Sequence, residues 1–171
     1  MIDVKRVVCG GALVALMPLM VLMAGCDPQR VEKLEEGVST EVEVRKQFGD
    51  PVTITVEPDG SKTMDYPRQP EGWTNYVIQI GPDGKMSSLR QLLTADNFAR
   101  VQPGLGQQEV RNLLGRPAKQ QRFDLKKEEV WDWRFKNGQE SKIFSVTFNT
   151  AGQVTATGVG DDPRETLTGA K

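Results

Sequence analysis

Few residues of this sequence could carry out covalent or metal chemistry, because the chain has no histidine and only two cysteines. The absence of histidine excludes Ser-His-Asp and Cys-His nucleophilic sites and histidine-based metal sites. Paired carboxylates can act alone, but no pair of Asp or Glu stands apart from ordinary surface charge. We therefore expect no enzyme, no metal, no cofactor and no small-molecule substrate.

The cysteine at position 26 is placed for a different reaction, the attachment of lipid. Lys5 and Arg6 precede an uncharged apolar run over residues 7–24, and this order is typical of a secretory signal. The run ends in Leu-Met-Ala-Gly-Cys over residues 22–26, which resembles the lipobox of bacterial lipoproteins. We predict a signal peptide over residues 1–25, cleavage between Gly25 and Cys26, and acylation of Cys26 by chains such as palmitate.

Two other interpretations of the leader are a membrane-spanning anchor and an ordinary signal peptide. A spanning helix needs about 20 apolar residues, and the run is almost long enough. Pro18 within the run and a cysteine after two small residues favour the lipoprotein leader. Stable anchoring needs more than one acyl chain, which a diacylglyceryl group and an N-acyl group together supply.

The charge of the chain argues against a nucleic-acid partner. Removing residues 1–25 leaves 20 Lys and Arg against 22 Asp and Glu, whereas nucleic-acid-binding domains show a strong basic excess. Cys9 leaves with the leader and Cys26 is consumed by lipidation, so we expect no disulfide, although the envelope would permit one.

An internal repeat organises the rest of the chain. The segment from Gly37 to Pro51 recurs from Gly104 to Pro117, and the apolar, glycine and proline positions match in the same order. The matched pairs, each 66 positions apart, are Val44 and Val110, Phe48 and Leu114, Gly49 and Gly115, and Pro51 and Pro117. We predict two copies of one supersecondary unit, over residues 26–93 and 94–159.

Each copy is predicted to begin with two helices. Asp27 and Thr94 are candidate caps of the first helices, over residues 27–34 and 95–101. The second helices are expected over residues 40–48 and 107–114. Gly49 and Gly115 would end them in the left-handed cap conformation, with a proline two residues later preventing continuation.

An antiparallel meander of about four strands is expected after the helices of each copy, which makes the fold class α+β. Trp131, Trp133 and Phe135 alternate along one strand, and alternation buries one face of such a sheet. We expect these aromatic residues in the core, with a binding platform as the alternative. Asp132 and Arg134 would then lie on the open face and are candidates for a binding face.

The arrangement of the two units bears on where a partner would bind. The short connection between them predicts rigid packing with adjacent sheets and one continuous polar face, which would include Asn75, Val77 and Gln79. Trp73 follows a Pro-Glu-Gly loop and is a candidate exposed anchor, with a core position as the alternative. Residues 160–171 are polar without apolar periodicity, which predicts a disordered tail.

The repeated motif resembles a known family. The spacing of Gly104, Val110, Leu114, Gly115 and Pro117, followed by an aromatic-rich meander, is similar to the signature of the BamE/SmpA/OmlA small lipoproteins. The tandem arrangement resembles the beta-lactamase inhibitory protein. This chain departs from single-copy BamE proteins by having two copies, and its first copy has Phe48 at the position of the family's leucine.

The resemblance implies a lipid-anchored, periplasm-facing module that binds a protein of the outer-membrane barrel assembly machinery or maintains the envelope. The alternative is an inhibitor-like module that binds an envelope enzyme through its concave sheet. An aspartate directly after the acylated cysteine, here Asp27, resembles the signal that keeps enterobacterial lipoproteins in the inner membrane. The outer membrane is favoured by the family, and the inner membrane stays open.

Overall fold

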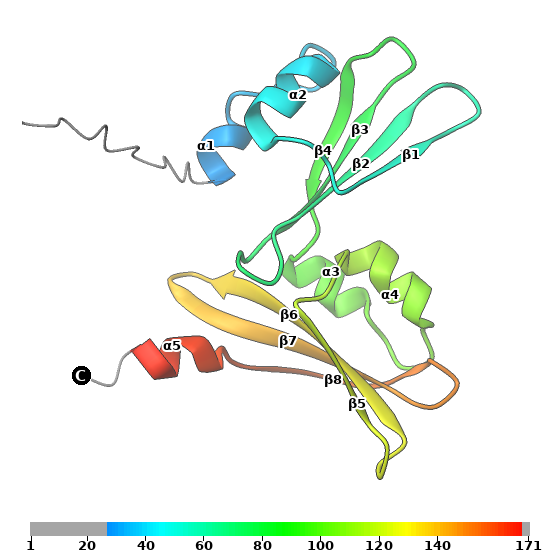
Figure 1. The fold of residues 1–171 in the computed structure, drawn as a ribbon, viewed down its shortest axis with the longest axis vertical. Coiled ribbons are helices and arrows are strands. Elements are labelled where there is room, and N and C mark those ends of the chain that lie inside the picture. The colour runs from blue at the N-terminus through cyan, green and yellow to red at the C-terminus, as the bar shows by residue number, and fades with distance from the viewer. Residues whose placement is uncertain (1–26, 169–171) are drawn as a thin grey trace, which may run out of the picture.

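The computed structural model describes residues 27–168 as two successive units of helices and a sheet (Figure 1). The first unit contains α1 (Asp27–Val31), α2 (Glu41–Phe48), β1 (Thr53–Val56), β2 (Lys62–Pro67), β3 (Asn75–Ile80) and β4 (Met86–Gln91). The second contains α3 (Ala95–Arg100), α4 (Gln107–Leu114), β5 (Lys119–Phe123), β6 (Glu128–Asn137), β7 (Glu140–Phe148), β8 (Val154–Asp161) and α5 (Pro163–Thr168).

Each unit has its own four-stranded antiparallel sheet, with the strands in sequence order. This confirms the predicted α+β class and the tandem helix-helix-sheet organisation. The signal peptide, Gly25 and Cys26 lie outside the described residues, so cleavage and lipidation stay predictions. Among the residues that the structure describes, no helix is long and apolar enough to cross a membrane.

The helix starts follow from local capping. The hydroxyl of Thr94 accepts a hydrogen bond from the backbone N–H of Asn97 at 3.3 Å, as a helix cap does. At α2 the carboxylate of Glu43 accepts from the backbone N–H of Thr40 at 2.8 Å. The equivalent carboxylate at α4, Glu109, accepts from the N–H of Gly106 at the same distance. α1 ends at Val31, three residues before the predicted end.

The helix ends differ from the prediction in one angle. Gly49 has φ 81° and ψ −162°, and Gly115 has φ 72° and ψ −158°. The positive φ is as predicted, but the predicted left-handed cap conformation is wrong, because ψ lies near −160° instead of near +45°. That region of backbone space is essentially restricted to glycine, so both positions require glycine more strictly than a left-handed cap would.

The two turn glycines, Gly37 and Gly104, make corresponding backbone contacts in the two copies. The backbone N–H of Gly37 donates to Met86 in the last strand of its sheet at 2.7 Å. In the second copy the N–H of Gly104 donates to Val154 at 2.9 Å. The turn before the second helix is therefore fastened to the last strand in both units.

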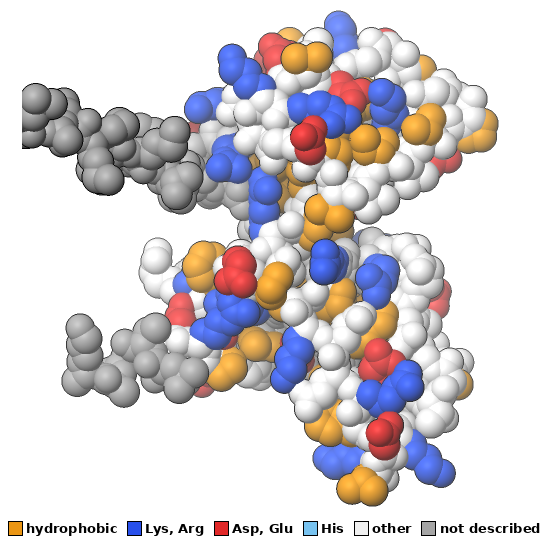
Figure 2. All heavy atoms as spheres, in the orientation of Figure 1, with side chains coloured by type: hydrophobic (Ala, Val, Ile, Leu, Met, Phe, Trp, Pro, Cys, Tyr) orange, Lys and Arg blue, Asp and Glu red, His pale blue; other side chains and the backbone are white. Residues whose placement is uncertain are grey.

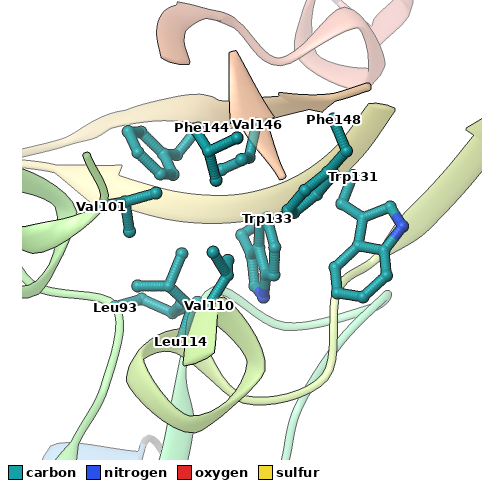
Figure 3. Close-up of a cluster of buried hydrophobic side chains, with 10 residues drawn as sticks. Leu93, Val101, Val110, Leu114, Trp131, Trp133, Phe144, Val146 and Phe148 are labelled. Atoms are coloured by element: carbon teal, nitrogen blue, oxygen red, sulfur yellow. The ribbon is translucent and has the colours of Figure 1, made fainter. Parts of the chain in front are cut away.

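Each unit has a separate hydrophobic core between its helices and one face of its sheet. In the second core Trp133 lies beside Val110 of α4, and Trp131 packs against Trp133 and Phe148 (Figure 3). This confirms the core interpretation of the tryptophans. The first core contains Val44, Phe48, Met64, Tyr66, Tyr76, Ile78, Ile80 and Met86. Leu93, which the repeat placed at the end of the first unit, packs in the second core.

The predicted disordered tail is wrong over residues 160–168. β8 continues to Asp161, and α5 follows. Polar contacts replace apolar periodicity as the ordering force: the Glu165 carboxylate lies 3.1 Å from Nζ of Lys136, and Asp162 is 1 % exposed. Residues 169–171 lie outside the described part.

The two sheets do not form one continuous face. Only residues 92–94 separate β4 from α3, so the helices of the second unit begin directly below the first sheet and lie between the two sheets (Figure 1). The prediction of adjacent sheets is therefore wrong. The open face of the first sheet faces α3 and α4 instead.

Candidate protein-binding cleft between the two units

A cleft of about 1420 Å³ lies between the open face of the first sheet and the outer faces of α3 and α4. The molecule narrows where the units meet (Figure 2). The sheet side of the cleft presents Thr53, Thr55, Thr63, Asp65, Val77 and Arg90, and the helix side includes Asp96, Asn97, Arg100, Gln108, Arg111, Asn112 and Arg116.

Arginine is the commonest charged residue around this cleft. Four arginines line it, at positions 90, 100, 111 and 116, against the acids Asp65, Asp96 and Glu109. Arg111 stacks over the Trp131 ring, with the guanidinium carbon 4.8 Å from the ring centre. Burial raises the pKa of the Asp65 carboxyl. No group of metal ligands occurs among the described residues.

Asn75, which lines the cleft, joins the first sheet to the end of α4. Nδ2 of Asn75 donates to the carbonyl oxygens of Leu114 at 2.7 Å and Arg116 at 2.9 Å. The intervening carbonyl, that of Gly115, accepts from Nε1 of Trp133 at 3.2 Å. A side-chain amide of the first unit therefore satisfies carbonyls that a helix end leaves unpaired.

A second contact covers an open strand edge. β5 pairs with β6 only as far as Asp132, so Arg134 on that edge has no strand partner there. The side-chain amide of Gln69 takes its place: Nε2 donates to the Arg134 carbonyl at 2.8 Å, and Oε1 accepts from the Arg134 N–H at 3.2 Å. Gln69 thus copies the two hydrogen bonds of a neighbouring strand.

The Arg134 side chain holds the loop between β2 and β3. Its Nε lies 2.5 Å from the Asp162 carboxylate, and both side chains are almost fully buried. Its guanidinium also donates to the carbonyls of Pro70 at 2.9 Å and Glu71 at 3.2 Å. The prediction that Arg134 lies on an open face is therefore wrong: it is 5 % exposed and joins the two units.

Trp73 belongs to the same junction. The Lys136 ammonium lies 4.5 Å from its ring centre and the Arg134 guanidinium carbon 5.4 Å. Both cations come from β6 in the second unit, so the ring stacks across the junction while staying 36 % exposed. Whether Trp73 also contacts a partner stays a prediction.

The remaining candidates lie apart from one another. Asp132 is half-buried and accepts from the Ser145 hydroxyl at 2.6 Å, outside the cleft. The prediction that Asn75 lies on the open face is wrong, because Asn75 is 1 % exposed. Of its predicted neighbours, Val77 lines the cleft, and Gln79 accepts from the Ser88 hydroxyl at 2.9 Å.

Sequence reasoning missed Gln69 and Asp162, and placed Asn75 wrongly. One signal existed for Asn75: asparagine is depleted in strands, and β3 carries it directly before the apolar triplet Tyr76, Ile78 and Ile80. A buried amide at such a position needs hydrogen-bond partners from elsewhere. Gln69 and Asp162 carry no such signal, because both stand in polar segments.

Comparison with known proteins finds one family model that is similar to the second unit. Residues 91–158 match the model described as the outer membrane protein assembly factor BamE domain. None of the curated proteins matches the chain.

Three solved structures are similar to parts of the chain. One, described as a candidate osmotically inducible lipoprotein OsmE, is 20% identical and covers 47% of this chain and 93% of that one, with a TM-score of 0.37. The DUF4309-family protein YjgB from Bacillus subtilis is 16% identical and covers 79% and 86%, with a TM-score of 0.32. A candidate beta-lactamase inhibitor protein from Streptococcus mutans is 12% identical and covers 79% and 95%, also with a TM-score of 0.32.

Proposed function

We propose that this chain, whose residues 91–158 match the BamE domain model, is a lipid-anchored, periplasm-facing binding module that supports outer-membrane protein assembly. The observation that carries the proposal is this domain match in a chain whose N-terminus has the sequence of a lipoprotein leader. The outer membrane is the location that the family favours, and Asp27 keeps the inner membrane as the second candidate.

The anchor would hold the folded part directly at the membrane surface. α1 starts at Asp27, the residue after the predicted acylated cysteine. No flexible linker separates the two, so the first unit would lie against the membrane. The second unit, joined to it by the buried contacts of Asn75, Gln69 and Arg134, would then project a fixed distance from the bilayer.

The cleft between the units is the surface that we assign to a protein partner. It is open to solvent and many charged side chains line it, whereas small ligands prefer enclosed pockets with few polar groups. Arginine is enriched at protein interfaces, and four arginines line this cleft. Because residues from β1, β2, α3 and α4 all contribute, the binding surface depends on the fixed orientation of the two units.

A photoreactive amino acid placed in the cleft tests this proposal in intact cells. Thr63 lines the cleft, and Leu125, in the turn between β5 and β6, is fully exposed away from it. We expect crosslinks from position 63 to a subunit of the barrel assembly machinery, with few from position 125. Capture of a soluble envelope hydrolase from position 63 would favour the inhibitor-like alternative, and equal products from both positions would contradict a binding role for the cleft.

The anchor has a separate test. Cys26→Ser removes the thiol that would receive lipid, so the variant should not label with palmitate and should stay uncleaved by the lipoprotein peptidase. Labelling of the variant at the level of the parent chain would contradict the lipoprotein assignment. Membrane fractionation of the parent chain, and of an Asp27→Ser variant, decides between the two membranes.

A further inference from the structure

β1 is an exposed edge strand with unusual composition for that position. It pairs with β2 on one side, and all four of its residues, Thr-Ile-Thr-Val, are exposed. Ile54 is 42% and Val56 63% exposed. Apolar side chains gather over β1 in the space-filling view (Figure 2). An uncharged, β-branched edge strand offers unpaired backbone groups to another strand.

The duplicated unit provides an internal comparison. Thr53 lies opposite Asp65, and Lys119 lies opposite the matching Asp132, so β1 and β5 correspond residue by residue. β5 is equally exposed but carries Lys119 and Arg122 where β1 carries Thr53 and Val56. Charges of this kind protect an edge from pairing. Charged side chains therefore protect the edge strand of the second unit, β5, from pairing with another strand, whereas the edge strand of the first unit, β1, has no such charges.

The charges near β1 do not protect it. Lys62 lies opposite Val56 in the sheet, but its ammonium is 2.6 Å from the Glu41 carboxylate. Arg45 also contacts Glu41, at 2.9 Å. The face that carries Ile54 and Val56 is therefore bordered by neutralised ion pairs instead of a free cation that would oppose the approach of another strand.

We propose that β1 pairs with β1 of a second copy of this chain, in antiparallel register about Thr55. In that register Thr55 lies opposite itself at the two-fold axis, and Ile54 lies opposite Val56 of the other copy. A two-fold axis perpendicular to the sheet places the same face of both sheets on the same side. Both pairs of Ile54 with Val56 therefore form on one side of the joined sheet. Cross-strand pairs of β-branched residues of this kind are favourable.

The pairing joins two four-stranded sheets into one of eight strands. The occupant is a second copy because the strand is complementary to itself: it contains no charge, and both of its apolar residues find an apolar partner in this one register. The threonine face of β1 lines the cleft, so the dimer would place two clefts side by side on one sheet. This inference does not depend on the identity of the partner that the cleft binds.

Cysteine crosslinking of the full chain in its own cells tests the register. Thr55→Cys places two thiols opposite each other at the axis, and the matched control is Gln121→Cys at the corresponding position of β5. After mild oxidation we expect a reductant-sensitive band of twice the monomer mass for Thr55→Cys and at least tenfold less for the control. Equal dimer from both variants, no dimer from Thr55→Cys, or a crosslink only to a different protein would overturn the proposal.

A charge at the interface provides the second measurement. Ile54→Arg places cations close to the axis of the dimer, and the matched change on β5 is Gln120→Arg. In the Thr55→Cys background, Ile54→Arg should reduce the crosslinked band at least tenfold and Gln120→Arg should leave it unchanged. Thermal unfolding of both variants checks that the monomer stays folded, which the exposure of Ile54 leads us to expect. An unchanged band in folded Ile54→Arg would contradict the pairing.

Discussion

Asn75 of the first unit fits against Gly115 of the second, and each constrains the other. The Asn75 amide donates to the carbonyls on both sides of Gly115, and a Cβ at Gly115 would lie 3.0 Å from Nδ2 of Asn75. The matching glycine of the first copy, Gly49, has nothing within 4 Å of such a Cβ. The same glycine of the repeat therefore ends a helix in both copies but contacts the other unit in only one.

This difference predicts unequal effects of the same substitution. Gly49→Ala and Gly115→Ala both force alanine into a backbone region that costs of order 1–3 kcal/mol. Gly115→Ala also displaces a buried donor from its two carbonyls, which adds about 1–3 kcal/mol. Chemical denaturation should show the larger loss of unfolding free energy for Gly115→Ala. Equal losses would show that the Asn75 contact does not depend on close approach.

The buried ion pair between Arg134 and Asp162 should be among the most sensitive positions of the molecule. Asp162→Asn leaves a buried guanidinium without its counter-charge, and breaking such a pair costs about 3–5 kcal/mol. The neighbouring Asp161→Asn is the control, because Asp161 pairs with Lys142 at 2.7 Å on the surface, where pairs contribute about 0–1 kcal/mol. Similar unfolding midpoints for the two variants would contradict the structural role of Arg134.

Two carboxyl groups should affect the pH dependence of stability in opposite directions. Burial raises the pKa of Asp65, so the stability it contributes is present below its unfolded pKa and is lost as pH rises through the folded pKa. The hydrogen bond from Lys62 is the main cause that lowers the pKa of Glu41, so its contribution is present above the unfolded pKa and is lost as pH falls.

Unfolding measured from pH 3 to pH 7 in Asp65→Asn and Glu41→Gln checks these signs. Relative to the parent chain, Asp65→Asn should become more stable as pH rises, and Glu41→Gln should become less stable. Parallel curves for both variants would show that neither pKa shift exists in the folded protein.

Local sequence signals predicted the elements of each unit but not the junction between the units. Glycine and proline spacing located α2 and α4, and two-residue alternation located the buried faces, because both depend on neighbours along the chain. The polar alternate residues were assigned to solvent by the same rule. For Arg134 and Asn75 that assignment was wrong, since their main-chain carbonyl partners belong to the other unit and the carboxylate that pairs with Arg134 lies 28 residues further along the chain. No periodicity reports such contacts.

Separating the two units should cost each of them stability, by an amount that depends on the position of the cut. The first unit loses the partners of Asn75 and Gln69, and the second exposes the edge of β6 together with the end of α4.

Leu93 packs in the second core at 4 % exposed, and burial of a leucine contributes about 1.5–3 kcal/mol. A second unit that begins at Leu93 should therefore be more stable than one that begins at Thr94, by a margin of that order. Both should unfold at lower denaturant than the same unit within the whole chain. If fragments 27–92 and 93–171 each unfold cooperatively with the stability they have in the intact protein, the junction contributes nothing and a binding surface fixed by both units is unsupported.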